Sequence, residues 1–366
     1  MDIRSALPTA LSTGALLGVI LAGLNLPAPT QAAPVIRLTS ATVAGPVKWD
    51  IPIVRNEHVN RFVEMFEERQ TDRMALYLKR SGRYEGMIRG KLRERGMPED
   101  LLFLSMVESG FNPNARSKAS AIGLWQFMAP TGRLYGLRID AYVDERRDPE
   151  RSTDAALRYL SDLHQQLGSW SLAAAAYNSG GNRVARIMRE VTGAAKGKES
   201  DFWRIRSRLP SETRDYVPLI YAAAIIGKDP ARYGLEDVER LMPLRVEQVD
   251  VPGGTPLSAV ARAVGVHAED IQDLNPHLIQ DRTPPGKPYP VRVPFGRAGL
   301  FAANFEKSPP TVASSPKQMA THRVSSGESL STIARRHGIT VAALQRENDL
   351  GRGTVIQPGQ LLKIPV

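Results

Sequence analysis

The hydrophobic pattern of this 366-residue chain changes its period near Pro243, and that change limits the folds open to it. From about Val59 to Ile226, apolar residues recur at the three- and four-residue spacing of amphipathic helices, with Gly or Pro between the segments. Beyond Pro243 the chain contains short β-like segments instead. We therefore expect a mainly α-helical fold, with one helical domain over residues 48–235 and small mixed modules after it.

Glycine and proline positions predict where the helices of the first domain begin and end. Gly96, Gly110 and Gly168 follow segments of helical period, as helix-terminating glycines do. Pro98 lies in the first turn of a predicted helix, where proline is tolerated. The expected helices cover residues 60–78, 83–95, 98–109, 153–167, 171–178 and 213–226.

The C-terminal part of the chain contains an internal repeat. At a constant offset of 73 residues, Gly254 pairs with Gly327, Leu257 with Leu330, Gly265 with Gly338, and Asn275 with Asn348. Each copy has the pattern strand, helix, helix, strand in about 45 to 50 residues, a length that suits a compact binding module. The copies cover residues 246–294 and 322–366, and a linker rich in Pro, Ser and Ala joins them over residues 295–321.

The amino terminus has the layout of a secretory signal peptide. Arg4 precedes an apolar run from Ala10 to Leu26, and Thr30 and Ala32 are small residues at the positions that signal peptidase reads. We expect residues 1–33 to be a signal peptide that directs export to the periplasm. The alternative is an uncleaved anchor helix, but the run is interrupted by polar residues and falls short of a strongly apolar span.

Composition excludes several kinds of function. Lys and Arg exceed Asp and Glu by 48 to 38, a net charge of +10, yet no polybasic block indicates nucleic-acid binding. The sequence contains no Cys, which excludes disulfides, thiolate metal sites and a lipid anchor attached to Cys. The histidines are scattered without metal-ligand spacing, and there is no phosphate-binding loop. We expect neither a metal nor a cofactor, and the oligomeric state stays open.

Glu108 is the strongest candidate for an active-site residue. It lies in the last turn of a predicted helix whose preceding residues, 101–107, are apolar nearly all round. A carboxylate that leaves a buried helix is poorly solvated and sits at the negative end of the helix dipole, so its pKa should rise. A raised pKa suits a general acid that works near neutral pH. The alternative is a Glu that reaches solvent past Gly110.

Three separated motifs give the chain a family resemblance. They are the segment from Glu108 to Met128, the pair Tyr177-Asn178 in AAAAYNSGG, and the segment Glu212 to Val217 in LPSETRDYVP. Together they resemble the lytic transglycosylases, which cleave bacterial peptidoglycan. RSGRY at residues 80–84 and the D-x-R-x-D-P string at 144–149 are most similar to the membrane-bound type. The resemblance implies a lysozyme-like helical catalytic domain.

The resemblance also implies roles for individual residues. Glu108 would be the catalytic acid and base, and the implied substrate-binding residues are Ser117, Gln126, Tyr177, Asn178 and Tyr216. Ser117 and Gln126 would contact the sugar near the scissile bond, Tyr177 and Asn178 would line the cleft, and Tyr216 would orient Glu108 by a hydrogen bond. Each also has a structural interpretation: Ser117 could cap a turn, Gln126 could satisfy loop backbone, and Tyr177 could fill the core. Trp125, among apolar neighbours, is expected in the core.

Most glycosidases need a second carboxylate, and the neighbours of Glu108 in sequence supply none. The next acids along the chain, in a charged segment with Arg146 and Arg147, are Asp140, Asp144, Glu145 and Asp148. They suit ion pairs and a helix start at Asp148-Pro149. The family mechanism uses one carboxylate, and the substrate's own C6 hydroxyl closes on C1 to give a 1,6-anhydro end. The alternatives are a goose-type lysozyme that delivers water and a non-catalytic wall-binding scaffold.

Residues 322–366 are similar to a LysM domain, a βααβ module that binds glycans containing N-acetylglucosamine. The glycan-binding residues that this resemblance implies are Gly327, Glu328, Ser329, Leu330, Ile356, Pro358 and Gly359. The first copy departs from the pattern at Pro256 and Val260 and has extra prolines, so its glycan affinity stays open.

Peptidoglycan glycan strands of N-acetylglucosamine and N-acetylmuramic acid are therefore the expected partner. Because the chain has no Cys for a lipid, we expect the modules to hold a soluble periplasmic protein at the wall. The two kinds of domain predict a division of labour. Truncation after Gly234 should slow action on intact sacculi and spare the chemistry on short soluble glycans.

Overall fold

The computed structural model describes residues 47–305, 320–325, 328–337, 339, 341–348, 350 and 356–364. The chain divides into two compact units, residues 1–306 and residues 307–366, and each is considered by itself. The predicted signal peptide and Gly327 lie outside the described residues.

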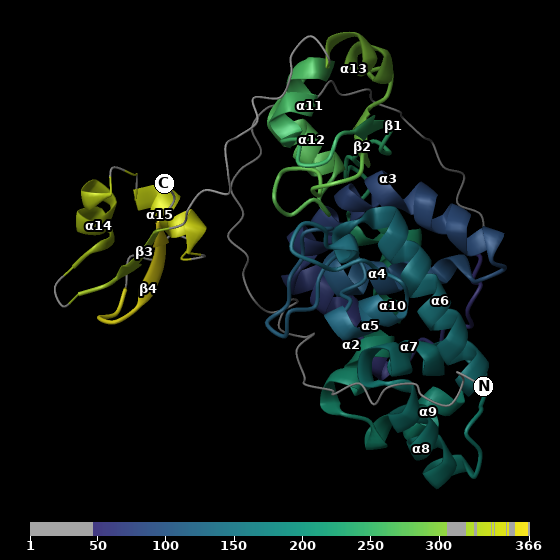
Figure 1. Cartoon of the computed structure of the whole chain (residues 1–366). Helices are drawn as coiled ribbons and strands as arrows, with labels where there is room; N and C mark the ends of the chain where they lie inside the picture. Colours follow the sequence, from purple (N-terminus) through teal and green to yellow (C-terminus); the bar gives the residue numbers. More distant parts are fainter. Residues whose placement is uncertain are drawn as a thin grey trace, which may run out of the picture. The chain divides into compact units, whose positions relative to one another are not determined.

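The first unit begins with a helical domain, coloured from purple to teal in Figure 1. Its elements are α2 (Glu57–Glu64), the π-helix η2 (Met65–Arg69), α3 (Thr71–Glu94), η3 (Glu99–Leu101), α4 (Leu102–Ser109), α5 (Ala129–Leu134), η4 (Glu145–Arg147), α6 (Pro149–Leu167), α7 (Trp170–Ser179), α8 (Gly181–Thr192), α9 (Asp201–Ile205), η5 (Arg206–Arg208), α10 (Ser211–Lys228) and η6 (Pro230–Tyr233). The expected mainly helical fold is confirmed, and Trp125 is fully buried in its core as expected.

Helix α4 is the centre of this domain. Every one of its residues is buried, and it packs against α3 and α10. Burial on all sides follows from a sequence that is apolar all round, because such a helix has no face to offer to water. The helix ends at Gly110, whose backbone is left-handed with φ of 56°. This end fixes the position of Glu108.

The start of the domain differs from the sequence-based expectation. We predicted helices at 60–78 and 83–95, but the chain breaks at Gln70 and α3 then runs without interruption through Gly82. A Cβ at Gly82 would lie 2.3 Å from the carbonyl oxygen of Leu241. This glycine therefore serves close packing of the 240–241 segment inside a helix and does not end one.

The predicted helix start at Asp148 is confirmed. Its side chain caps α6 by accepting hydrogen bonds from the backbone N–H groups of Glu150 and Arg151, both at 3.0 Å. Pro149 occupies the first turn, and Gly168, with φ of 80°, ends the helix. Local residue chemistry thus places both ends of this helix.

The rest of the first unit has the strand, helix, helix, strand order expected for the first copy. Its elements are β1 (Val246–Val251), α11 (Leu257–Val264), α12 (Ala268–Leu274) and β2 (Tyr289–Pro294). The strands pair antiparallel, with Val246 opposite Pro294 and Val251 opposite Tyr289. Within the segment expected as a linker, α13 (Ala298–Asn304) packs Phe301 into the same core. We refer to residues 245–305 as the first module.

The second unit repeats this order with β3 (Ala320–Arg323), α14 (Leu330–Arg336), α15 (Val341–Glu347) and β4 (Leu361–Ile364), the yellow elements of Figure 1. The strands pair antiparallel with Ala320 opposite Ile364. The apolar face that we predicted for its helices is confirmed, because Leu330, Ile333 and Leu344 are buried in its core. Among the helices that the structure describes in either unit, none is long and apolar enough to cross a membrane.

Candidate active site

The carboxyl group of Glu108 is enclosed by protein. The residue is 2% exposed, in the last turn of α4. The turn that follows is tight, since a Cβ at Gly110 would lie 2.0 Å from the ring of Tyr77. Only a glycine at this point lets the chain leave the buried helix while Glu108 stays inside the domain.

Tyr216 contacts this carboxyl group from α10. The phenol O–H of Tyr216 donates a hydrogen bond to Oε1 of Glu108, and both side chains are buried. The other carboxyl oxygen, Oε2, has no hydrogen-bond partner among the described residues. The contact between Tyr216 and Glu108 that the resemblance implied is thus present. A buried carboxyl with one oxygen unpartnered favours its neutral, protonated form.

The pKa of Glu108 is raised well above its usual value, as the sequence predicted. Burial is the largest cause, because it disfavours the charged form. The hydrogen bond from Tyr216 opposes this effect, and the negative charge of Glu212 adds to it. Burial and the charge of Glu108 likewise raise the pKa of both Tyr216 and Tyr177, so both phenols stay protonated.

Glu212 is a second acidic residue at the site, and sequence reasoning did not single it out. It lies in the first turn of α10 and interacts electrostatically with Glu108, and its Oε1 accepts a hydrogen bond of 3.4 Å from the Asn178 amide. Thr213 donates to Oδ1 of Asn178 at 2.7 Å. The sequence neighbours of Glu108 include no second carboxylate, and Glu212 lies far from it along the chain. The available signal was the presence of Glu212 in the same motif as Tyr216.

The loop that carries Ser117 and Gln126 is held by its own polar side chains. Oγ of Ser117 accepts a hydrogen bond from the backbone of Ala121 at 3.0 Å. The amide of Gln126 donates to the carbonyls of Ala115 and Gly123 at 3.2 and 3.0 Å, while its buried Oε1 has no partner in the described part of the chain. These are the structural roles considered above for both residues, and their contact with sugar stays a prediction.

The same loop is attached to the helices on either side of it. The hydroxyls of Ser105 and Ser109 in α4 both donate to the carbonyl of Leu124, at 3.1 and 2.8 Å. The phenol of Tyr177 in α7 donates to the carbonyl of Trp125 at 2.7 Å. We refer to residues 115–127 as the site loop. Its position relative to Glu108 is fixed by these bonds.

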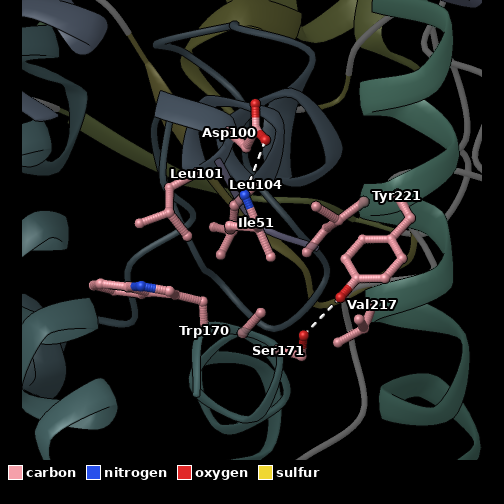
Figure 2. Close-up of a pocket in the computed structure, with 10 residues that line it drawn as sticks. Ile51, Asp100, Leu101, Leu104, Trp170, Ser171, Val217 and Tyr221 are labelled. Atoms are coloured by element: carbon pink, nitrogen blue, oxygen red, sulfur yellow. Dashed lines mark hydrogen bonds between the residues drawn. The ribbon is translucent and has the colours of Figure 1, made fainter. Parts of the chain in front are cut away.

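Figure 2 shows a small cavity lined by residues of α4, α7 and α10. Ile51, Asp100, Leu104, Trp170 and Tyr221 are among its lining residues. Its volume of about 20 Å³ has room for one water molecule and none for a sugar ring. The hydrogen bond from the backbone N–H of Ile51 to Asp100, 3.2 Å, fastens the chain before α2 to this place. This cavity is therefore a packing feature.

The predicted glycan-binding residues of the second unit differ in exposure. Leu330 is buried in the core, Ile356 packs against it, and Glu328 is partly buried. Ser329 is exposed and caps α14, accepting from the backbone of Thr332 at 3.3 Å. Pro358 and Gly359 are exposed at the turn before β4, where Gly359 has φ of 88°. Their contact with glycan stays a prediction.

In the first module, the loops at the corresponding positions are bonded to each other. The backbone N–H of Gly254 donates to Pro284 O at 3.0 Å, and that of Leu257 to Asp281 O at 2.8 Å. The hydroxyl of Thr283, which is fully buried, accepts from the backbone of Thr255 at 2.9 Å. These hydrogen bonds hold the two loops of the first module directly against each other.

The acids that follow the site loop have structural partners. Oδ1 of Asp140 accepts from the backbone of Tyr142 and Val143 at 2.8 and 2.9 Å. Asp144 pairs with Arg146, and Asp148 caps α6. Among the described residues, no group of three or more His, Asp or Glu could hold a metal ion.

Tyr216→Phe should shift the pH dependence of the reaction toward higher pH. The hydrogen bond from Tyr216 favours the charged form of Glu108, so its loss raises the Glu108 pKa further. A general acid must be protonated, and the basic limb of a kcat/KM profile would therefore move upward, with kcat about tenfold lower from lost orientation. Tyr221→Phe, on the same helix and bonded to Ser171, is the control. An unmoved basic limb would contradict this role.

Comparison with protein families identifies three segments. Residues 86–200 match the transglycosylase SLT domain, residues 245–309 match the LysM-like domain of lytic transglycosylase MltD, and residues 322–365 match the LysM domain. Membrane-bound lytic murein transglycosylase D of Escherichia coli K12 is 34% identical over 289 residues, 77% of this chain and 63% of that protein. The chain therefore spans less than two thirds of this relative's length.

Two further matches are shorter. The peptidoglycan transglycosylase gp16 of Escherichia phage T7 is 36% identical over 111 residues, 30% of this chain and 8% of that protein. Among solved structures, the 70 kDa soluble lytic transglycosylase SLT70 from Escherichia coli aligns with 26% identity over 43% of this chain and 25% of that one, with a TM-score of 0.33. By the family models, residues 86–200 are similar to the transglycosylase SLT domain, and the two segments that follow are similar to the LysM-like domain of MltD and to the LysM domain.

Proposed function

We propose that this protein is a peptidoglycan lytic transglycosylase. It cleaves the β-1,4 bond between N-acetylmuramic acid and N-acetylglucosamine without water and leaves 1,6-anhydro-N-acetylmuramic acid ends, which makes it a carbon–oxygen lyase. The observation that carries the proposal is the buried carboxyl of Glu108, bonded to Tyr216 and held with a raised pKa, inside an SLT domain. A carboxyl that stays protonated can donate to a glycosidic oxygen.

The proposed reaction uses this single carboxyl twice. Glu108 gives its proton to the glycosidic oxygen, and the bond from that oxygen to C1 of the muramic acid breaks. The resulting carboxylate then takes the proton of the C6 hydroxyl, whose oxygen bonds to C1. Glu108 ends protonated, and no water is consumed. The substrate's acetamido group stabilises the positive charge at C1 during the exchange.

The remaining site residues take supporting roles in this proposal. Ser117, Gln126, Tyr177 and Asn178 bind the sugars on either side of the bond, and Tyr216 orients Glu108. Support for Gln126 comes from its buried Oε1, an acceptor without a partner in the described chain, which a sugar hydroxyl or amide could satisfy. Support for Asn178 comes from its place in the same hydrogen-bonded group as Glu212.

We further propose a periplasmic location after export through residues 1–33, with the protein held at the wall by its C-terminal LysM domain. The positive net charge favours association with anionic envelope polymers. An uncleaved signal segment would add a membrane anchor.

A lysozyme-like hydrolase is the second candidate, and the charge of Glu212 close to Glu108 favours it, because a base near the site could activate water. Mass spectrometry of digested peptidoglycan separates the two reactions, since an anhydro end is lighter than a reducing end by one water. We expect anhydro ends. Reducing ends would replace the lyase by the hydrolase, and no cleavage of any kind would favour a wall-binding scaffold.

Deletion of residues 307–366 should slow cleavage of intact sacculi by about tenfold or more. The deletion removes the LysM domain, whose binding to the wall would raise the local concentration of the enzyme on this insoluble substrate. On short soluble glycans we expect kcat/KM to be unchanged. The first unit keeps its cores, which share no residue with the buried cluster of the second unit. Rates on both substrates, measured side by side, test this separation. An equal loss on both would contradict it.

A further inference from the structure

The first module takes a residue of the helical domain into its core. Val143, from the segment between α5 and α6, is fully buried in one cluster with Val249, Leu257 and Leu278 of the module. Backbone hydrogen bonds join this segment to the module on either side of Val143. The N–H of Asp144 donates to the carbonyl of His277 at 2.9 Å, and the N–H of Ile279 donates to that of Tyr142 at 3.1 Å. The module is therefore packed onto this segment and shares a core with it, unlike a domain joined only by a linker.

A buried ion pair fastens the same contact. The guanidinium of Arg292 in β2 donates to both carboxylate oxygens of Asp148, at 2.7 and 3.0 Å. The side chains are only 10% and 1% exposed. Burial alone would raise the pKa of Asp148, but the hydrogen bonds and charge of Arg292 hold it below its usual value. Since Asp148 also caps α6, this pair connects the module directly to the start of a core helix.

Arg146 continues the connection from this segment to the site loop. Its guanidinium pairs with Asp144 through two hydrogen bonds, at 2.9 and 2.7 Å. It also donates to the carbonyls of Ser120 and Phe127 in the site loop, at 3.2 and 3.1 Å. The side chain is 7% exposed, and the planar guanidinium reaches these acceptors at the same time.

Gly123 shows how closely the two segments lie. A Cβ at this position would lie 1.8 Å from the carbonyl oxygen of Arg146, so the backbones are in direct contact. The next residue, Leu124, is bonded to Ser105 and Ser109 of α4 through its carbonyl. An unbroken series of contacts therefore runs from Arg292 of the module to the helix that carries Glu108.

From this series we infer that the first module is a brace for the active site, and that Arg146 is a positioning residue that fixes the site loop with Ser117 and Gln126. The inference rests on the proposed function for its effect on catalysis. It revises the expected division of labour, because truncation after Gly234 would remove Arg292 and uncover Val143. Only the C-terminal LysM domain would then act as a separable binding unit.

The first experiment substitutes Arg146 by Lys in the full chain. Lysine keeps a positive charge, but its single nitrogen has three donors and cannot keep both bonds to Asp144 together with the bonds to the two loop carbonyls. We expect kcat on a short soluble glycan to fall by about 10- to 100-fold with little change in KM, since a displaced loop misplaces the reacting groups. Arg138→Lys is the matched control, because Arg138 pairs with Asp140 on the same segment and is half exposed. A kcat within about twofold of wild type for Arg146→Lys would overturn the positioning role.

Hydrogen exchange tests the brace without reference to activity. The amides of Ile122 and Phe127, each bonded to the other's carbonyl at 3.1 Å, report on the site loop. We expect these amides to lose protection in Arg146→Lys and in Arg292→Met. Arg292→Lys should keep part of the protection that Arg292→Met loses. The control is Arg262→Met, at an exposed position in α11, and it should leave protection unchanged. Loop protection equal to wild type in Arg292→Met, with the module still folded, would overturn the brace.

These two readouts separate the inference from the proposed function. If the wild type cleaves no peptidoglycan, the proposed function fails while the exchange measurement still decides whether the module braces the loop. If the wild type is active and Arg292→Met unfolds the module, the inference is tested by loop protection and kcat in the Arg292→Lys and Arg146→Lys variants. A loop that keeps its protection in both, with kcat unchanged, counts against the inference.

Discussion

Glu108→Gln is expected to lower turnover of peptidoglycan by at least about 100-fold, because general acid catalysis by a positioned side chain contributes about that much or more. Glutamine has nearly the same shape and can accept the hydrogen bond from Tyr216, but its amide is too weak an acid to protonate the glycosidic oxygen. The measurement is the release of soluble fragments from purified sacculi. Glu85→Gln, a partly buried glutamate outside the site, is the control.

The fold should survive this substitution, so that lost activity can be assigned to chemistry. The pKa of Glu108 is raised in the folded state, so its contribution to stability is full below the usual Glu value of 4.5 and is lost as the pH rises through the folded pKa. Glutamine removes this dependence. Thermal unfolding should be measured from below pH 4.5 to neutral pH. At neutral pH the variant should be at least as stable as wild type. Unchanged turnover in a folded Glu108→Gln protein would leave Glu108 without a catalytic role.

Gly123→Ala is expected to destabilise the first unit by at least about 3 kcal/mol and to inactivate the protein. Two costs add: a residue with a Cβ is strained at φ of 89°, and the Cβ would overlap the carbonyl oxygen of Arg146. Because that oxygen belongs to the backbone, relief requires the two segments to move apart. Denaturant unfolding and turnover on a soluble glycan measure the two effects.

Gly136→Ala is the matched control for this substitution. Gly136 has nearly the same backbone conformation, with φ of 85°, but the nearest atom to its Cβ would be 3.8 Å away at the end of the Arg158 side chain. It should show the backbone strain alone, about 1 kcal/mol, with activity retained. Similar losses in both variants would mean that the contact with Arg146 does not matter.

Much of the candidate site could be predicted from local sequence. The apolar residues before Glu108 predicted a buried helix, and burial raises the pKa of an acid at its end whatever surrounds that helix. Asp148 and Gly168 predicted the two ends of α6, since capping depends on nearby backbone groups. The contact of Tyr216 with Glu108 was expected only through the family resemblance, because no local pattern relates residues so far apart.

The structural role of each glycine could not be predicted from the sequence. Gly110 and Gly168 end helices, whereas Gly82 lies inside one and Gly123 lies in a loop. A glycine serves either a left-handed turn or a close approach of another segment, and sequence alone does not say which. The partner that makes Gly82 necessary is Leu241, far along the chain.

The sequence by itself determined the helical domain, the repeated modules and an acid placed at the end of a buried helix, because periodicity, caps and burial act over a few residues. Only the tertiary structure decided that Glu212 lies close to Glu108, and that Arg292 pairs with Asp148, 144 residues earlier, to pack the first module onto the segment beside the site loop. Such contacts depend on how helices, strands and loops that are far apart in the sequence pack together. The free energy of a buried ion pair depends on both partners together, so the sequence around one partner does not predict the other.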